Sequence, residues 1–194
     1  DFWELYQQIS MPEPVYGDWS HSLEDTPQGF LAGSYENTDM HLFGPEQIAA
    51  SRRAYYACIT QVDYQLGRLF GALREHGLFE NTWILFTSDH GEMLGDHYMS
   101  QKNLFFEGSA HVPFILVPPA GRAIPHNNQV DGVITLADVF PTILAMAGLT
   151  PPEDGSGENL LPFLSGKGQK EKIFYGDSLH TNFCVMENRK KLIY

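Results

Sequence analysis

The segment from Thr87 to His97 contains the residues best suited to binding a metal ion. Asp89 and His90 are adjacent, follow a short apolar run and precede Gly91. Together a carboxylate and an imidazole offer one hard oxygen and one nitrogen ligand to a divalent cation. Neighbouring strand residues point to opposite faces, so both reach one ion only where the strand turns, which Gly91 permits. The pattern predicts half of a metal site, with an ordinary polar turn as the alternative.

The same polar region contains two groups that could act on an anionic substrate. Lys102 is the only lysine or arginine between Arg74 and Arg122. An ammonium can bind a sulfate or phosphate oxygen and stabilise charge that develops on a leaving group. His97 could donate a proton or orient the anion. A solvated surface lysine and a hydrogen-bonded structural histidine are the alternatives.

No residue is marked out as a nucleophile. The sequence has no Gly-x-Ser-x-Gly elbow, no glycine-rich phosphate loop ending in Lys-Ser or Lys-Thr, and no paired-cysteine metal motif. Cys58 lies in an apolar helical pattern and is expected to be buried and inert. Because Cys184 lies in a strand-like run, the two cysteines do not indicate a disulfide framework. No role is assigned to the remaining acidic residues of the polar region, Glu92, Asp96 and Glu107.

Two apolar runs flank this region, at residues 83–87 and 112–117. Neither alternates with polar residues, which is typical of central parallel strands that are buried on both faces. The connection between them is too long for a routine loop, and connections of that length are usually functional. Ligands of open α/β sheets bind at the carboxyl ends of the strands. The first strand therefore places Asp89 and His90 where a ligand is expected.

One long helix is predicted to begin at Pro45 and to stop at Gly77, after an irregular segment over residues 1–44 that wraps the surface. Apolar residues recur along this helix at alternating steps of four and three, and the resulting stripe should face a sheet. Its members are Tyr55, Ile59, Val62, Leu66, Leu69 and Leu73.

The last third of the chain shows three local signals. Thr135 and Asp138 resemble a capping box that opens a helix ending near Gly148, with Pro141 delaying or kinking its start. A Pro-, Gly- and Asn-rich stretch and the polar residues 166–172 then suggest a boundary. Beyond it, residues 173–176 are predicted to form a strand, and residues 183–186 and 192–194 a hairpin.

Composition sets limits on the partners of this chain. Twenty-four acidic against 12 basic residues give a net charge of -12, which argues against nucleic acid as a partner. No run approaches the roughly 20 apolar residues that a membrane span requires. The chain opens at Asp1 without an initiator methionine or signal-like segment, so an upstream part is expected. The sequence gives no indication of oligomeric state.

Four stretches, in this order along the chain, resemble the sulfatase family of the alkaline phosphatase superfamily. The polar region, with Asp-His-Gly-Glu, Gly-Asp-His and then Lys102, is similar to that of arylsulfatases, choline sulfatases and phosphonate monoester hydrolases. The other three stretches are Tyr56–Asp63 with Gly67, Val112–Ile115, and Asp138–Leu144 with Gly148.

The resemblance implies an α/β sandwich with a mostly parallel mixed sheet flanked by helices. Residues 1–165 would be the C-terminal part of the catalytic domain, and residues 166–194 the start of a small antiparallel subdomain. It further implies that Asp89 and His90 bind calcium, or manganese or magnesium, with carboxylates from earlier in the chain. Lys102 and His97 would assist the leaving alcohol or hold the sulfate.

The family nucleophile is a formylglycine made within Cys/Ser-x-Pro/Ala-x-Arg, a motif absent from this chain and expected before Asp1. The chain alone is therefore expected to be inactive. The resemblance implies hydrolysis of a small-molecule or carbohydrate sulfate ester by a periplasmic or secreted protein. A phosphonate monoester or phosphodiester hydrolase and a non-catalytic binding relative are the alternatives. His111 and the residues 157–160 depart from the family pattern and leave substrate preference open.

Overall fold

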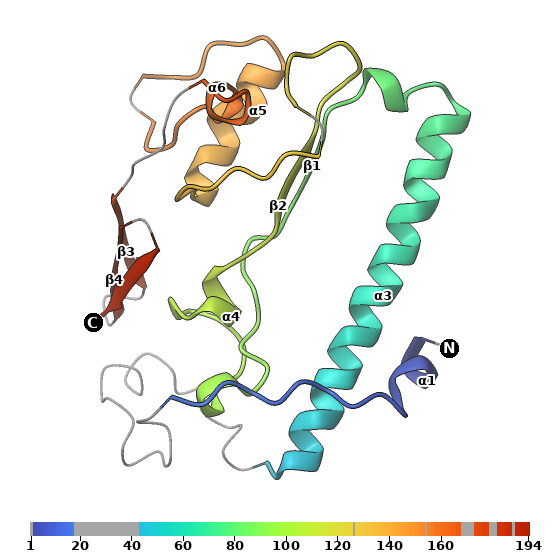
Figure 1. Ribbon diagram of the computed structural model, residues 1–194, viewed down its shortest axis with the longest axis vertical. Coiled ribbons are helices and arrows are strands. Elements are labelled where there is room, and N and C mark those ends of the chain that lie inside the picture. The colour runs from blue at the N-terminus through green and yellow to red at the C-terminus, as the bar shows by residue number, and fades with distance from the viewer. Residues whose placement is uncertain are drawn as a thin grey trace. The chain divides into compact units, whose positions relative to one another are not determined.

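The computed structural model describes residues 2–17, 43–125, 127–153, 155–167, 173–178, 182–187 and 189–194 (Figure 1). The chain divides into two compact units. The first comprises residues 1–79, 90–112 and 178–182, and the second residues 80–89, 113–177 and 183–194. Most of the irregular segment predicted for residues 1–44 lies outside the described residues.

The first unit is built on the long helix α3 (Pro45–Glu75). Proline in the first turn and Gly77, whose φ is 65°, mark its two ends, as predicted. The short helix α1 (Phe2–Tyr6) lies against α3 (Figure 1). The hydroxyl groups of Tyr6 and Thr60 are 2.6 Å apart, and the ring centroids of Phe2 and Tyr64 are 5.8 Å apart.

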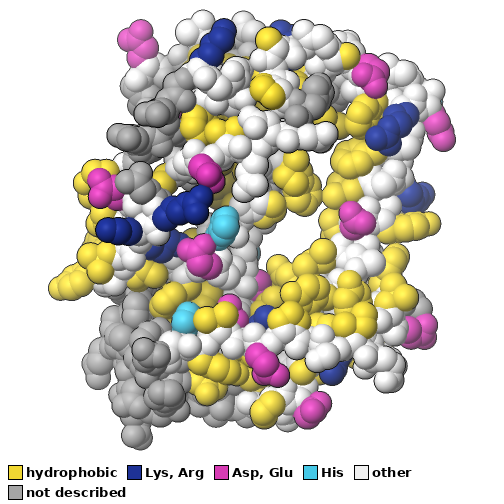
Figure 2. Space-filling view, viewed as in Figure 1, with side chains coloured by type: hydrophobic (Ala, Val, Ile, Leu, Met, Phe, Trp, Pro, Cys, Tyr) yellow, Lys and Arg dark blue, Asp and Glu magenta, His cyan; other side chains and the backbone are white. Residues whose placement is uncertain are grey.

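The apolar stripe of α3 does not face a sheet within the described part of the first unit. Ile59, Val62 and Leu69 are each about half exposed, and Figure 2 shows hydrophobic side chains gathered along this helix. Cys58 is also exposed, so the prediction that it is buried is wrong. Helical periodicity is a local property of the sequence, whereas the partner that covers the apolar face is not encoded in the helix itself.

The second unit contains the two predicted strands, β1 (Ile84–Thr87) and β2 (Phe114–Val117), preceded by the 3-10 turn η2 (Phe79–Asn81). The strands pair antiparallel, with Ile84 opposite Val117 and Thr87 opposite Phe114. Parallel pairing was the prediction, and these two strands do not follow it. Phe86 and Ile115 are exposed, so the prediction that both faces of these strands are buried is also wrong. A run without polar alternation indicates apolar faces but does not fix the direction of the neighbouring strand.

The capping box of Thr135 and Asp138 is present, as predicted. It opens the 3-10 turn η4 (Leu136–Asp138), which leads into α5 (Val139–Met146), and Gly148 follows with a φ of 75°. The 3-10 start agrees with the delay predicted from Pro141, which has no N–H to donate. A one-turn helix, α6 (Leu161–Leu164), comes next along the chain.

A three-stranded sheet in the order β3-β4-β5 ends the chain. Its strands are β3 (Ile173–Ser178), β4 (Asn182–Glu187) and β5 (Lys190–Ile193). The last two pair antiparallel, with Cys184 opposite Ile193, which confirms the predicted hairpin. The domain boundary near residue 165 stays a prediction.

None of the helices in the described part of the chain combines the length and the apolar character that a membrane-spanning helix needs.

Candidate functional site

Asp89 and His90 follow directly after the end of β1. Both side chains are exposed. Asp89 ends a segment of the second unit, and His90 begins a segment of the first. Nδ1 of His90 lies 2.8 Å from the carbonyl oxygen of Gly91. With Nδ1 donating to that oxygen, Nε2 carries the lone pair that a cation requires.

These two residues do not form a complete metal site. Among the described residues, no group of three or more histidine, cysteine, aspartate or glutamate side chains is placed to hold an ion. Calcium takes about 6–8 ligands, so a carboxylate and an imidazole can supply only part of its shell. The donor types fit a divalent cation, and the number of donors fits half of a site.

Residues 90–112 of the first unit form a long loop that contains the 3-10 turn η3 (Asp96–Tyr98) and the one-turn helix α4 (Glu107–Ala110) and closes on its own backbone. The N–H of Gly91 donates to the carbonyl of Ser109, and the N–H of Glu92 to that of Gly108, both at 2.7 Å. A Cβ on Gly91 would lie 2.1 Å from the carbonyl oxygen of Gly108, and the φ of Gly91 is not left-handed. Gly91 is therefore required for close backbone contact, whereas the sequence suggested that it permits a turn.

The loop has a small hydrophobic core and an internal acceptor. Met93, Met99 and Leu104 are at most 4% exposed, and Phe106 packs against them. The carboxylate of Glu92 accepts hydrogen bonds from the N–H groups of Leu94 and Gln101. Sequence reasoning gave Glu92 no role. The structure shows that it ties together two parts of the loop that are apart in sequence.

His97 occupies a constrained position in this loop. Its backbone is left-handed, with φ 53° and ψ 28°, and its ring centroid lies 4.5 Å from that of Phe106. Burial lowers the pKa of the imidazole, and the neighbouring Asp96 partly opposes this shift. The ring is therefore mostly neutral at neutral pH. A neutral imidazole still has an N–H that can donate to a substrate oxygen.

Lys102 lies on the same loop and is half-buried. Its neighbours Gln101 and Asn103 have φ values of 64° and 74°. The carbonyl of Gln101 accepts from the N–H of Met93 at 2.9 Å, which anchors this part of the loop to its core. The loop thus carries both predicted catalytic residues.

Arg52 and Asp96 are two residues of this site that sequence reasoning missed. Arg52 lies on α3, and its Nη1 is 3.3 Å from Oδ1 of Asp96. The two side chains are 10% and 22% exposed. Sequence spacing could not pair a residue of the long helix with one of a distant loop. A signal was nevertheless present, because an arginine within an apolar helical pattern usually has an acidic partner when buried.

A buried hydrogen-bond network in the second unit is centred on Asp138 at the start of α5. Asp138 is fully buried, and its carboxylate accepts from the N–H groups of Thr135 and Glu158, both at 2.8 Å. The hydroxyl of Thr142 donates to the carbonyl of Asp138 at 2.6 Å. Gly157 has no room for a Cβ beside the carbonyl of Ala137. Asp138 and Thr142, the first and last residues of an Asp-x-x-Pro-Thr sequence, therefore hold residues 157–160 against α5.

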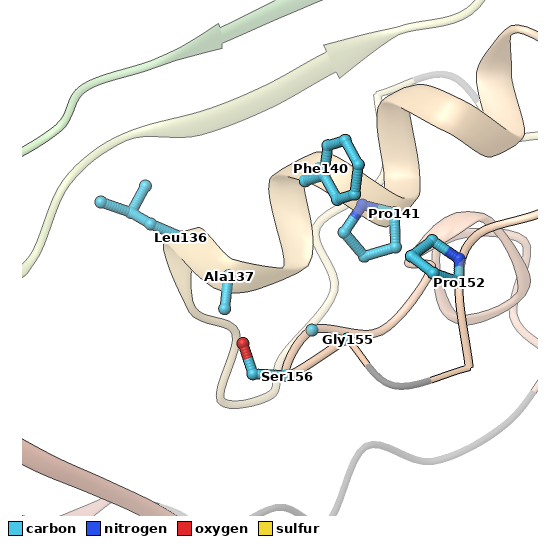
Figure 3. A pocket seen from close by; sticks show the side chains of 8 residues that line it. Leu136, Ala137, Phe140, Pro141, Pro152, Gly155 and Ser156 are labelled. Carbon is cyan, nitrogen blue, oxygen red and sulfur yellow. The ribbon is translucent and has the colours of Figure 1, made fainter.

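A shallow pocket lies beside this network at the start of α5 (Figure 3). Its lining is mainly apolar and consists of Leu136, Ala137, Phe140, Pro141, Pro152, Gly155, Ser156 and Gly157. Among the described residues, those that line the pocket include no acidic, basic or histidine side chain, so these residues offer no group for acid–base or metal chemistry.

The chain resembles known proteins in sequence. The sequence model of the Sulfatase family matches residues 13–149. An arylsulfatase of Clostridium perfringens is 34% identical over 160 residues, which are 82% of this chain and 32% of that protein. Arylsulfatase K of Xenopus laevis is 34% identical over 182 residues, which are 94% of this chain and 32% of that protein. The chain thus spans about a third of the length of these curated relatives.

Solved structures show the same likeness. The phosphonate monoester hydrolase of Agrobacterium radiobacter is 33% identical, with a TM-score of 0.67 over 77% of this chain and 34% of that protein. A protein solved in complex with its substrate D-glucosamine-2-N,6-O-disulfate is 27% identical, with a TM-score of 0.68 over 79% of this chain and 34% of that protein. These likenesses confirm an α/β fold of the alkaline phosphatase type.

Proposed function

This chain belongs to the sulfatase family, and on that premise we propose that the whole protein hydrolyses sulfate esters. The observation that carries the proposal is the family match over residues 13–149. That range includes all four predicted site residues, Asp89, His90, His97 and Lys102. The two arylsulfatase relatives support the same reaction.

We propose that the protein binds a divalent cation, with calcium preferred and manganese or magnesium as alternatives. A carboxylate oxygen of Asp89 and Nε2 of His90 would be two of its ligands, and other parts of the whole protein would supply the rest. The exposure of both side chains and the contact of His90 Nδ1 with Gly91 support this assignment. When bound, such a cation offsets the negative charge of the sulfate group and orients it.

Lys102 and His97 act on the sulfate group and the alcohol that leaves it. The ammonium of Lys102 binds a sulfate oxygen and stabilises negative charge as the bond from sulfur to the alcohol oxygen breaks. The N–H of His97 donates a hydrogen bond to the departing oxygen. The nucleophile in this proposal is a formylglycine from outside the chain, because Cys/Ser-x-Pro/Ala-x-Arg does not occur in it.

A phosphonate monoester or phosphodiester hydrolase is the second candidate. It is favoured by the likeness to the phosphonate monoester hydrolase of Agrobacterium radiobacter, which is 33% identical. The likeness to a protein solved with a sulfated glucosamine supports sugar sulfates as one substrate class of the first candidate. A periplasmic or secreted location is part of the same proposal.

The two candidates are separated by assaying the whole protein with para-nitrophenyl sulfate, a sulfated glucosamine and para-nitrophenyl phenylphosphonate. We expect the highest kcat/KM with a sulfate ester. A clear preference for the phosphonate would establish the second candidate, and no turnover of any of them would favour a binding relative. We expect Lys102→Ala to lower kcat on the order of a hundredfold. Lys167→Ala, at an exposed lysine of the second unit, is the matched control.

A further inference from the structure

Arg52 connects the long helix α3 to the turn over residues 94–98, which contains His97. Its Nη1 donates to the carbonyl oxygen of Leu94 at 2.8 Å and to Oδ1 of Asp96 at 3.3 Å. These acceptors lie on the two sides of Gly95, and Asp96 is the residue before His97. One buried guanidinium from α3 thus holds both sides of the turn.

The carboxylate of Asp96 also binds the N-terminal segment. The N–H of Val15 donates to the same Oδ1 at 3.0 Å, and the N–H of His97 donates to the carbonyl of Val15 at 2.7 Å. The ring of Tyr16 stacks on that of Tyr98, with centroids 4.5 Å apart. The backbone of His97 is therefore held through Asp96 from α3 and directly by Val15, while Tyr16 contacts the ring of the neighbouring Tyr98.

The turn needs such support because its backbone is strained. Three of its non-glycine residues have left-handed conformations, with φ of 50° at Leu94, 53° at His97 and 59° at Tyr98. Residues of this kind persist only where the surrounding structure fixes them. Two of the three are contacted at the backbone by Arg52 or Val15, and the third through its ring.

We propose that Arg52 is a positioning residue of the sulfatase site, acting through Asp96 and Leu94 to aim the imidazole of His97 at the leaving group. This inference rests on the proposed function of His97. A guanidinium is suited to the task because it stays charged and its several N–H groups diverge in a fixed plane. Loss of these contacts leaves the left-handed turn free to relax and moves the imidazole.

A positioning role and a purely structural role differ in one measurable respect. If Arg52 served folding alone, its replacement would lower the active fraction of the enzyme equally for every substrate. If it aims His97, the loss grows as the leaving group becomes poorer, because a poor leaving group depends more on hydrogen-bond donation. The dependence of kcat on the leaving group therefore distinguishes the two roles.

The test uses the whole protein with para-nitrophenyl sulfate, a good leaving group, and phenyl sulfate, a poor one. We expect Arg52→Met to lose on the order of a hundredfold in kcat with phenyl sulfate and about tenfold with para-nitrophenyl sulfate. Arg52→Lys should be intermediate. Arg53→Met is the matched control, because Arg53 donates to the carbonyl of Ile9, away from the loop, at 3.3 Å. Equal losses with both substrates would overturn the proposal.

Amide hydrogen exchange tests the same contact without turnover. We expect Arg52→Met and Asp96→Asn each to speed exchange at residues 94–99 at least tenfold, with Arg53→Met unchanged there. If Arg52→Met does not fold, Arg52→Lys and Asp96→Asn serve in both assays. Unaltered exchange at residues 94–99 would overturn the inference. A parent protein that cleaves no sulfate ester would overturn the proposed function. Amide hydrogen exchange would then still test whether Arg52 holds residues 94–99 in place.

Discussion

Gly91 and Gly108 approach each other so closely that a Cβ on Gly91 would lie 2.1 Å from the carbonyl oxygen of Gly108. The contact brings together the two ends of the loop that carries His97 and Lys102. Neither residue could have been singled out for this reason from the sequence, because the requirement arises from a neighbour seventeen positions away, from 91 to 108.

Gly91→Ala is predicted to destabilise the protein by about 1–3 kcal/mol, because backbone atoms must move to admit the methyl group. Gly67→Ala is the control, since a Cβ there meets nothing within 4 Å and the site is in the interior of α3. That control should stabilise the protein by up to about 1 kcal/mol. Urea denaturation measures both changes. Equal midpoints for Gly91→Ala and the parent would refute the prediction.

The pairing of Arg52 with Asp96 predicts non-additive stability changes. Arg52→Met should lower the free energy of unfolding by about 1–3 kcal/mol, because it leaves a mostly buried carboxylate without its charged partner. The double variant Arg52→Met/Asp96→Leu should be less destabilised than the sum of the two single variants. A double-mutant cycle by urea denaturation measures the coupling, and strict additivity would show that the two side chains act independently.

The proposed metal site predicts the loss of both metal and turnover in the whole protein. Asp89→Ala and His90→Ala each remove one ligand. Each variant should bind less divalent cation, as measured by elemental analysis, and should lose nearly all sulfatase activity. Asp131→Ala is the control, because Asp131 forms an exposed ion pair with Arg189 in the second unit. Full metal content together with full activity in the Asp89 and His90 variants would rule out the assignment.

The burial of His97 predicts a specific pH dependence of stability. Its pKa in the folded protein is lowered from 6.5, chiefly by burial, with Asp96 opposing. The unfolded chain therefore binds a proton more readily than the folded chain. Its contribution to stability is complete above pH 6.5 and is lost as the pH falls from 6.5 toward the lowered pKa.

His97→Asn should flatten this part of the stability profile, since asparagine does not titrate and tolerates a left-handed backbone. Urea midpoints of the parent and the variant, measured from roughly pH 5 to pH 8, test the effect across the range in which histidine titrates. Parallel profiles for the two proteins would show that His97 does not contribute to the pH dependence of stability.

Local features of the structure could be predicted from the sequence. Pro45 and Gly77 bound α3, and Thr135 and Asp138 form the capping box before α5, because proline, glycine and short polar side chains act on their own few neighbours. The hairpin of β4 and β5 is also a short-range structure.

Features that depend on distant partners could not be predicted. The antiparallel pairing of β1 with β2, the exposure of Ile59 on α3 and the contact between Arg52 and Asp96 all depend on which segments meet in space. An apolar run or an arginine in a helix indicates that a partner is needed but does not identify it. The four candidate site residues could be proposed from the sequence and stay a prediction, whereas the residues that hold the loop in place could not be proposed from it.

The antiparallel pairing of β1 and β2 has a consequence for the stretch of chain that joins the two strands. Thr87 lies opposite Phe114, so the polypeptide that leaves one strand returns to the other at the same end. Backbone hydrogen bonds from Gly91 to Ser109 and from Glu92 to Gly108 also join the two ends of the stretch between them. Residues 93–107 therefore leave and return at neighbouring points of the first unit, and main-chain hydrogen bonds fix both ends of the stretch.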